Sequence, residues 1–231
     1  MKSLGILFGL IFPLVMSAQD SLNQVDNKGL KQGYWIKKSE DGGKVYEGRF
    51  VNDQPVDTFL YYDVNGDKNA RLIWLNAEKS NATIYYPDGS IAAEGVYSNK
   101  KKDGLWKFFD GEGRLSTEQN YTNGKKDGAY IIYYDDGSIS VSTTYRNGLE
   151  HGLRQEFWLD GKPRFKGEIV DGNPDGEVKY FNQEGKLEEK GTYKNAVKHG
   201  KWFHYGQYGV DKITIFEYGN KIEEKSIENQ E

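Results

Sequence analysis

Short stretches in which polar and apolar side chains alternate recur along the chain, each ended by a turn signal. Segment 114–121 is one example, with Leu115, Thr117, Gln119 and Tyr121 on one parity. The same parity recurs in segments 90–97 and 138–145. A period of two with one polar side is typical of a half-buried β-strand. Outside the N-terminal apolar run and the C-terminal tail, glycines and turn signals interrupt every window long enough for a helix, so the pattern predicts strands throughout.

The predicted strands belong to a unit that repeats about every 24 residues. The eight unit starts are Gly33, Asp57, Ser80, Gly104, Gly128, Gly152, Gly176 and Gly200. Nine residues after each start comes a further glycine, at Gly42, Gly66, Gly89, Gly113, Gly137, Gly161, Gly185 and Gly209. A fixed period of this length indicates stacked supersecondary units.

Each unit is predicted to be a β-hairpin. The later glycine suits a tight reversal within the unit, and pairs such as Asn123-Gly124 suit the turn into the next unit. We therefore expect an all-β fold over residues 33–222, namely an elongated antiparallel meander or solenoid of about eight stacked 24-residue β-hairpin repeats with about sixteen strands. The second unit is the irregular one, because Asp57 stands at its start and its outgoing turn lacks the usual Asn-Gly pair.

Aromatic residues occupy two positions of the first strand that have opposite parity. Two residues after the start stand Trp35, Phe59, Trp106, Tyr130 and Trp202. Five residues after the start stand Tyr62, Tyr85, Phe109, Tyr133, Phe157, Phe181 and Tyr205. Either a bulge re-aims the strand or both faces of the sheet carry rings, and the sequence leaves both alternatives open. An aromatic strip on a second face would mark a partner site, so the seven rings of the later position are candidate partner-binding residues.

The N-terminal segment is typical of a secretory signal. Lys2 precedes an apolar run from Leu4 to Met16, and the small residues Ser17 and Ala18 follow. The run is shorter than the roughly 17 to 25 residues that a membrane-spanning helix needs. We expect residues 1–18 to be a cleavable signal peptide, with the mature protein secreted or periplasmic and without a transmembrane segment. Residues 19–32 would form an exposed leader and residues 223–231 a charged tail.

Composition narrows the possible chemistry. The chain has no cysteine, which excludes disulfides, thiolate catalysis and thiolate metal sites. Removal of the signal would delete only Lys2 among the charged residues, so 31 basic residues become 30 against 35 acidic ones and the net charge becomes -5. This negative charge disfavours nucleic acid as a partner.

Lysines gather in equivalent turns of two adjacent units and form a candidate anion-binding edge. These are Lys100, Lys101, Lys102, Lys125 and Lys126. The alternative is an ordinary solvated edge, because Glu150, Asp171 and Asp175 follow along the same line and mixed surface charge favours solubility.

No catalytic or metal-binding arrangement emerges from the sequence. His151 and His199 occupy the same repeat position two units apart, a separation of roughly 19 Å that is too large for one metal ion. The segment starting at Asp171 opens like a calcium loop, but Asn182 stands where the closing glutamate belongs. There is also no activated serine motif. We expect no enzyme activity, no metal and no cofactor.

Two groups of residues carry a family resemblance. Tyr46-Glu47-Gly48-Arg49-Phe50-Val51-Asn52 resembles a MORN repeat, and the stretch from Gly128 through Tyr134-Asp135-Asp136-Gly137 to Asn147-Gly148 is similar to the bacterial MORN-variant unit. The resemblance covers residues 33 to about 222. It implies a repeat fold, and proteins of this kind are variously linked to protein scaffolding, to membrane or lipid association and, in some bacterial variants, to an antitoxin label.

The sequence and the resemblance together favour an exported, non-enzymatic repeat scaffold that binds another protein through a face of its sheet. One alternative is a protein that binds lipid headgroups at a membrane surface through the lysine turns. Another is an antitoxin-like protein that neutralises a partner, although the predicted signal peptide argues against a cytoplasmic antitoxin.

Overall fold

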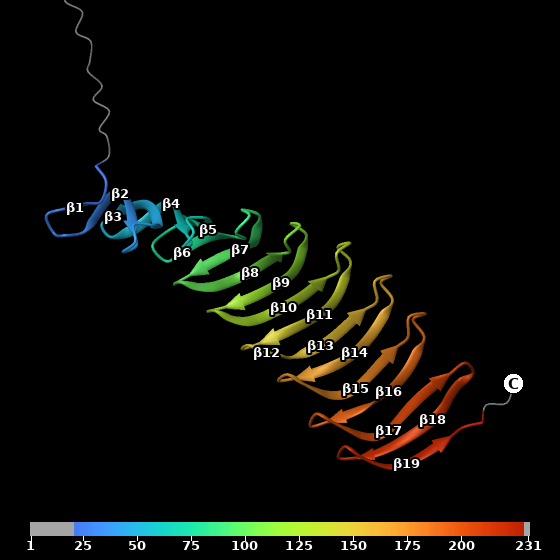
Figure 1. Cartoon of the computed structure of the whole chain (residues 1–231). Coiled ribbons are helices and arrows are strands. Elements are labelled where there is room, and N and C mark those ends of the chain that lie inside the picture. The colour runs from blue at the N-terminus through green and yellow to red at the C-terminus, as the bar shows by residue number, and fades with distance from the viewer. Residues whose placement is uncertain (1–20, 229–231) are drawn as a thin grey trace, which may run out of the picture.

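The computed structural model describes residues 21–228, and this part of the chain forms one open antiparallel β-sheet without a helix (Figure 1). Its nineteen strands are β1 (Gln24–Val25), β2 (Lys31–Lys38), β3 (Lys44–Val51), β4 (Gln54–Tyr62), β5 (Lys68–Trp74), β6 (Lys79–Tyr85), β7 (Ile91–Ser98), β8 (Lys101–Phe109), β9 (Leu115–Thr122), β10 (Lys125–Tyr133), β11 (Ile139–Arg146), β12 (Leu149–Glu150), β13 (Gly152–Phe157), β14 (Pro163–Val170), β15 (Asn173–Phe181), β16 (Leu187–Lys194), β17 (Val197–Gly206), β18 (Gly209–Glu217) and β19 (Asn220–Ser226). Strands pair antiparallel with the next strand along the chain, except that β12 and β13 both pair with β11, so the predicted elongated meander of hairpins is confirmed.

Two kinds of turn join the strands, and both follow the predicted positions. Within a unit, the Gly113 amide donates to the Asp110 carbonyl at 3.0 Å, and the Asp110 amide donates to Arg114 at 3.0 Å. Between units, Asn123 and Gly124 both have positive φ, 52° and 83°, which is the backbone of a type I′ turn. The Gly124 amide also donates to the Lys102 carbonyl of the previous turn at 2.8 Å, so neighbouring turns are tied together.

The start residue of each unit marks a bend in the sheet. In β10 the three residues 127–129 lie opposite the single residue Asn120 of β9, because Lys126 pairs with Tyr121 and Tyr130 pairs with Gln119. Gly128 lies within this bulge with φ of +102°, a conformation that favours glycine. Ser80 is the exception, since β5 and β6 pair in regular register from Trp74 and Ser80 onwards.

The structure shows that the two aromatic positions lie on opposite faces of the sheet. Tyr130 pairs across the strands with Gln119 and Thr143, which places these three side chains on one face. Tyr133 is an odd number of residues further along the same strand, and its hydroxyl donates to Glu118 on the other face at 2.9 Å. We call the face of Tyr130 the trough face and the face of Tyr133 the back face. Both faces therefore carry rings.

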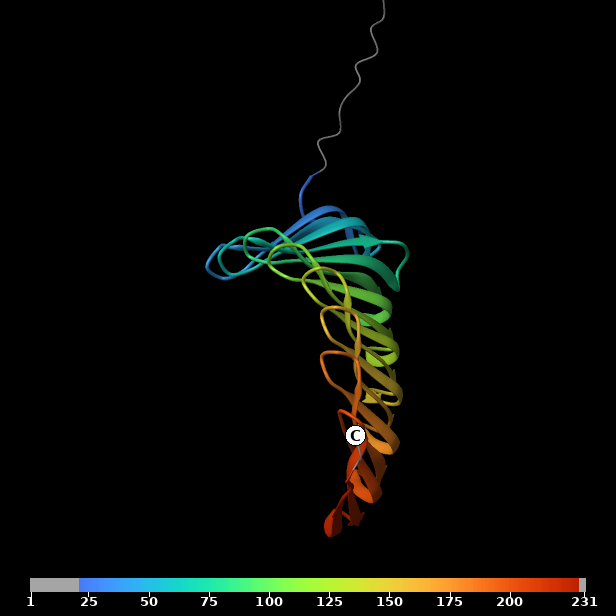
Figure 2. The same ribbon diagram turned by 90° about the vertical axis from the view of Figure 1, so that its right-hand side faces the viewer.

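The sheet is curved and twisted. Figure 1 shows successive hairpins side by side with their strands bent along their length, and Figure 2 shows that the ribbon twists from the N-terminal to the C-terminal hairpins. Hollows of about 330 to 700 Å³ open along the trough face. Because the sheet is a single layer, its core consists of the side chains buried in this trough.

The ends of the described chain extend the sheet. β1, which lies in the predicted leader, pairs with β2, and β19 pairs with β18, so residues 223–226 of the predicted charged tail continue as strand. The predicted signal peptide at residues 1–18 lies outside the described residues. Within residues 21–228 no helix has the length and apolarity needed to cross a membrane.

Candidate functional site: the two faces of the sheet

Trp106 shows how the trough is packed. Its side chain is 0% exposed, and its indole lies flat across Gly95 of the neighbouring strand, where a β-carbon would stand 2.3 Å from the ring. The indole N–H donates to the Val96 carbonyl at 3.0 Å, and the ring makes an edge contact with Tyr97 at 5.0 Å between centroids. Trp202 lies over Gly191 in the same way. The bulge at the unit start is what brings these rings across the adjacent strand.

Lysine side chains cover the rings of the trough. Lys102 Nζ lies 4.4 Å from the centroid of a Trp106 ring and 4.6 Å from that of Phe108. Burial lowers the pKa of Lys102, and the nearby charge of Lys126 adds to this effect. The same arrangement recurs in three other units, as Lys31 over Trp35, Lys126 over Tyr130 and Lys198 over Trp202. Each of these cation–π contacts contributes on the order of 0.5 to 2 kcal/mol.

The candidate anion-binding edge is therefore divided between two places. Lys100, Lys101 and Lys125 are exposed at the inter-unit turns. Lys102 and Lys126 are half-buried with their ammonium groups over trough rings. Only the first three remain free to meet an anion in solution. The spacing that separates the two groups was not recognised in the sequence: a lysine two residues before a unit start accompanies a ring two residues after it.

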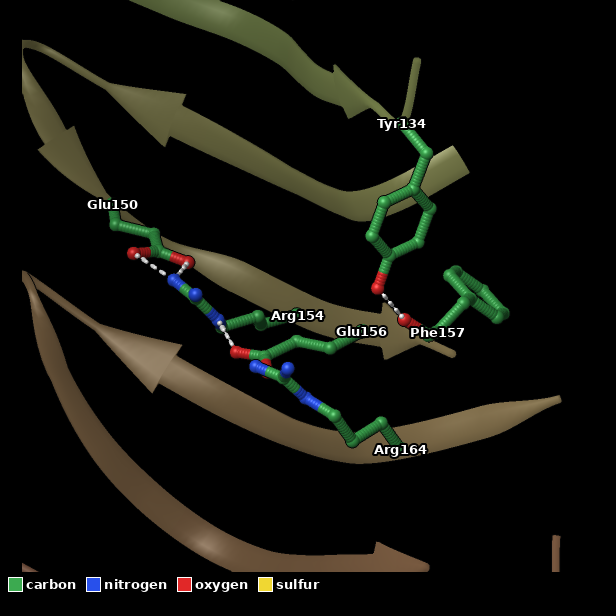
Figure 3. Close-up of polar contacts among 6 residues, drawn as sticks. All are labelled: Tyr134, Glu150, Arg154, Glu156, Phe157 and Arg164. Atoms are coloured by element: carbon green, nitrogen blue, oxygen red, sulfur yellow. Dashed lines mark hydrogen bonds and ion pairs between the residues drawn. The ribbon is translucent and has the colours of Figure 1, made fainter. Parts of the chain in front are cut away.

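A charged cluster replaces the lysine and ring in the sixth unit (Figure 3). Arg154 takes the ring position, and its Nη1 lies 3.1 Å from both carboxylate oxygens of Glu150, which takes the lysine position. Arg154 Nε donates to Glu156 at 2.7 Å, and Arg164 Nη2 donates to the other oxygen of Glu156 at 2.6 Å. A hollow of about 410 Å³ lies beside the cluster. All the strong donors and acceptors here are already paired with one another, so the cluster holds the sheet together.

The pKa of Glu156 leads to a prediction about acid stability. Burial by itself raises the pKa of Glu156, but the hydrogen bonds from Arg164 and Arg154 outweigh it and hold the pKa below its usual 4.5. A carboxyl group whose pKa is lowered on folding stabilises the folded state at pH values above its unfolded-state pKa. This stabilisation is lost as the pH falls through the folded-state pKa. Glu156→Gln is expected to lower the free energy of unfolding by about 1.5 to 3 kcal/mol at pH 7. The measurement is denaturant unfolding of both proteins between pH 7 and pH 3.

The difference between the two proteins should shrink as the pH falls below 4.5, because the native protein then loses the charge that the variant lacks. Glu112→Gln is the matched control. Glu112 pairs with Arg114 on the surface, and its side chain is 72% exposed, so a change well below 1 kcal/mol is expected. A gap for Glu156→Gln that stays constant from pH 7 to pH 3 would contradict the assignment.

The seven candidate partner-binding rings lie on the back face by strand alternation, and all are half-buried. Two of them are held by glutamates, since the Tyr62 hydroxyl donates to Glu47 and the Tyr133 hydroxyl donates to Glu118. Burial raises the pKa of Tyr133, and the Glu118 hydrogen bond raises it further. The exposed apolar side chains of Ile73, Leu105 and Leu153 lie on the same face.

Four segments of the chain, residues 81–99, 102–123, 126–147 and 174–195, match the MORN repeat variant family. These four segments are MORN repeats. The resemblance read from the sequence is thus confirmed for the hairpins β6–β7, β8–β9, β10–β11 and β15–β16. MORN repeats form a non-enzymatic family of repeat modules that generally bind proteins or lipids.

Solved structures match this chain only weakly. A point mutant of TarM from S. aureus in complex with fondaparinux, alpha-GlcNAc-glycerol and UDP has 12% identity and a TM-score of 0.24, and covers 46% of this chain and 19% of its own. The GtfA/B complex bound to UDP and GlcNAc has 14% identity and a TM-score of 0.22, with 48% and 22% covered. This chain thus spans about a fifth of the length of those chains. The search of the curated proteins found no match.

Loop rings join neighbouring hairpins at the edge opposite the inter-unit turns, and the sequence did not single them out. The Tyr134 hydroxyl donates to the Phe157 carbonyl at 2.7 Å (Figure 3), and Tyr86 donates to the Phe109 carbonyl at 2.9 Å. Both rings stand six residues after a start, and the recurrence of a ring at this position was the available signal.

The histidines and the calcium-like segment have partners within the sheet. His151 Nδ1 and Arg146 Nη2 both approach Asp171 Oδ1, at 3.3 and 3.6 Å. His204 Nδ1 lies 3.5 Å from Glu189, and the His199 ring packs on Tyr218 at 5.3 Å. In residues 21–228 no three His, Asp or Glu side chains are grouped closely enough to hold a metal ion.

Proposed function

We propose that the chain is an exported, non-enzymatic scaffold that binds another protein through the back face of its sheet. The observation that carries this proposal is the difference between the two faces. In five units a lysine or arginine side chain of the chain itself lies over the rings or in an ion pair on the trough face. The back face instead presents half-buried rings beside exposed leucines, and no part of residues 21–228 packs over it. An exposed apolar surface of this kind marks a protein interaction site.

The binding surface can be tested by photo-crosslinking in the intact cell. A photoreactive residue placed at Leu105 or Leu153 on the back face is expected to give one discrete crosslinked protein. The matched control position is Val64, which is 96% exposed at a hairpin loop. Leu105→Glu together with Leu153→Glu should abolish the crosslink from other back-face positions and leave the melting temperature nearly unchanged. Equal crosslinking from Val64 and from the back face, or no crosslink at all, would count against this function.

The export part of the proposal has its own test. The mature protein recovered from the producing cell should begin after Ser17 or Ala18, which mass spectrometry of the intact chain measures directly. A chain that keeps residues 1–18 and stays in the cytoplasm would contradict export and would favour an antitoxin-like role instead.

A second candidate function rests on the exposed lysines Lys100, Lys101 and Lys125, which lie at adjacent turns on one edge of the sheet. An anionic lipid surface would attract such an edge at low salt. The measurement is flotation with vesicles that contain phosphatidylserine. Replacement of these three lysines with glutamate should abolish flotation if this function holds, and flotation that ignores both the salt concentration and the replacement would exclude it.

A further inference from the structure

A hollow of about 360 Å³ lies in the trough where the repeat pattern breaks. It is lined by Tyr61, Trp74, Tyr97, Glu78, Ser80 and Lys100. Three rings from β4, β5 and β7 therefore surround it, while Glu78 and Lys100 stand at its exposed rim. The hollow lies on the trough face and is separate from the proposed back-face interface.

Three departures from the repeat pattern, all near the start of the third unit, accompany this hollow. Ser80 replaces the start glycine, so β5 and β6 pair without the bulge that bends the other units. Ala82 stands where Trp106 and Trp202 stand in their units, which removes the ring that would cover the neighbouring strand. Glu78 stands two residues before the start, where Lys102 lies in the next unit.

The other units show which group occupies the corresponding place in the trough. In four of them the chain's own lysine ammonium lies over the trough rings, at 4.9 Å for Lys31, 4.4 Å for Lys102, 4.6 Å for Lys126 and 3.7 Å for Lys198. At the hollow the rings of Trp74 from the second unit and Tyr97 from the third remain, but Glu78 supplies a carboxylate in place of the ammonium. The trough thus keeps rings at this point but not the lysine two residues before the start, and the nearest cation of the chain itself is Lys100 at the rim.

Two polar atoms at the hollow have no hydrogen-bond partner among the described residues. Ser80 Oγ belongs to a side chain that is 1% exposed, and Trp74 Nε1 is equally shielded from solvent. A buried polar atom without a partner costs about 1 to 3 kcal/mol, so an occupant that pairs with it gains affinity. Ser80 Oγ can accept an N–H, and Trp74 Nε1 donates to a carbonyl or another acceptor.

We propose that this hollow binds the ammonium group of a lysine side chain from a partner polypeptide. The rings of Tyr61, Trp74 and Tyr97 attract the cation, Ser80 Oγ accepts one of its N–H groups, and the Glu78 carboxylate balances its charge. A backbone carbonyl of the same partner segment can accept the Trp74 N–H. A quaternary ammonium has no N–H for Ser80, which makes a primary ammonium the better fit. Lys100 at the rim opposes the cation and limits the affinity.

The experiment uses the mature protein, uniformly labelled with ¹⁵N, and follows the indole N–H resonance of Trp74, which is assigned with Trp74→Phe. The probe is the capped amino acid N-acetyl-lysine methylamide, compared with its norleucine and Nε-acetyl-lysine counterparts and with tetramethylammonium. The lysine probe is expected to shift the Trp74 resonance saturably, with a Kd at least about fivefold below that of the other three, as a contribution of about 1 kcal/mol implies. Equal binding of the norleucine probe or of tetramethylammonium would overturn the proposal.

Two variants at the exposed rim change the charge in opposite directions without touching the core. Glu78→Lys, which gives this unit the lysine of its neighbours, should abolish the shift, whereas Lys100→Gln should lower the Kd by about two- to fivefold. The melting temperature checks that both variants remain folded. Binding that survives Glu78→Lys would overturn the proposal. Leu105→Glu on the back face should leave the Kd unchanged, so a failure of the protein interface and a failure of this site are seen separately.

Discussion

Gly95→Ala is expected to lower the free energy of unfolding by about 3 kcal/mol, near the upper end of what overpacking costs. A β-carbon on residue 95 would stand 2.3 Å from Trp106 Cδ2 and 2.4 Å from Trp106 Cε2. The indole cannot retreat, because its N–H is held by the Val96 carbonyl and Lys102 lies over its other side. Denaturant unfolding monitored by circular dichroism measures the change.

Gly111→Ala is the matched control for this prediction. Residue 111 lies in the hairpin loop of the same unit, has ordinary φ and would place a β-carbon with nothing within 4 Å. Its stability should change by less than about 0.5 kcal/mol. In a background of Trp106→Ala the cost of Gly95→Ala should largely disappear, because the clashing ring is gone. A full cost in that background would show that the ring is not the reason for glycine at this position.

Most of the architecture could be predicted from the sequence because residues typical of turns stand at fixed positions and mark the ends of the strands. The glycine nine residues after each start and the Asn-Gly pairs between units both prescribe positive φ, and the structure has positive φ at Gly113, Asn123 and Gly124. Period-two alternation then fixes strands between these turns. The estimate of about sixteen strands fell short of nineteen because β1 and β19 extend the two ends and β12 separates from β13.

Which side chains share a face of the sheet could not be predicted, because a bulge changes which side chains meet without changing the residue count. The sequence left open whether Tyr130 and Tyr133 share a face. The pairing of Tyr130 with Gln119 and the bond of Tyr133 to Glu118 place them on opposite faces. The contact of Lys102 with the Trp106 ring could not be predicted from the sequence for the same reason. The bulge at Gly104 places Trp106 beneath the lysine that precedes it on the same strand.

Comparison of the units with one another shows that the two trough positions vary together. Wherever a lysine stands two residues before the start, a ring stands two residues after it, as with Lys102 and Trp106. Where Glu150 replaces the lysine, Arg154 replaces the ring and the contact becomes an ion pair. Attraction between the two positions is preserved while its chemistry changes. The units that start at Asp57 and Gly176 have a proline in place of the lysine, and the unit that starts at Ser80 has Glu78 and Ala82 at the two positions, beside a hollow of the trough.

A destabilising substitution should unfold the sheet only locally, because each hairpin packs only on its neighbours. Trp202 lies in the last hairpin, over Gly191, with its indole N–H donating to the Thr192 carbonyl at 3.2 Å. Tyr193 and Lys198 complete its surroundings, at 5.2 and 3.7 Å from the ring. Beyond this hairpin the sheet continues only with β19, whose residues are all exposed. Trp202 is therefore the largest fully buried side chain of the final unit.

Trp202→Ala is expected to remove about 3 to 5 kcal/mol, more than one terminal hairpin can lose and stay folded. Hydrogen exchange measured by mass spectrometry should then show loss of protection across β17, β18 and β19, while β8 to β11 keep theirs. The matched control is Tyr208→Ala, which removes a ring that is 60% exposed in the loop of the same hairpin and should leave protection intact. Uniform loss of protection along all strands after Trp202→Ala would mean that the sheet unfolds as a single cooperative unit, and the nearest-neighbour account of its stability would then be wrong.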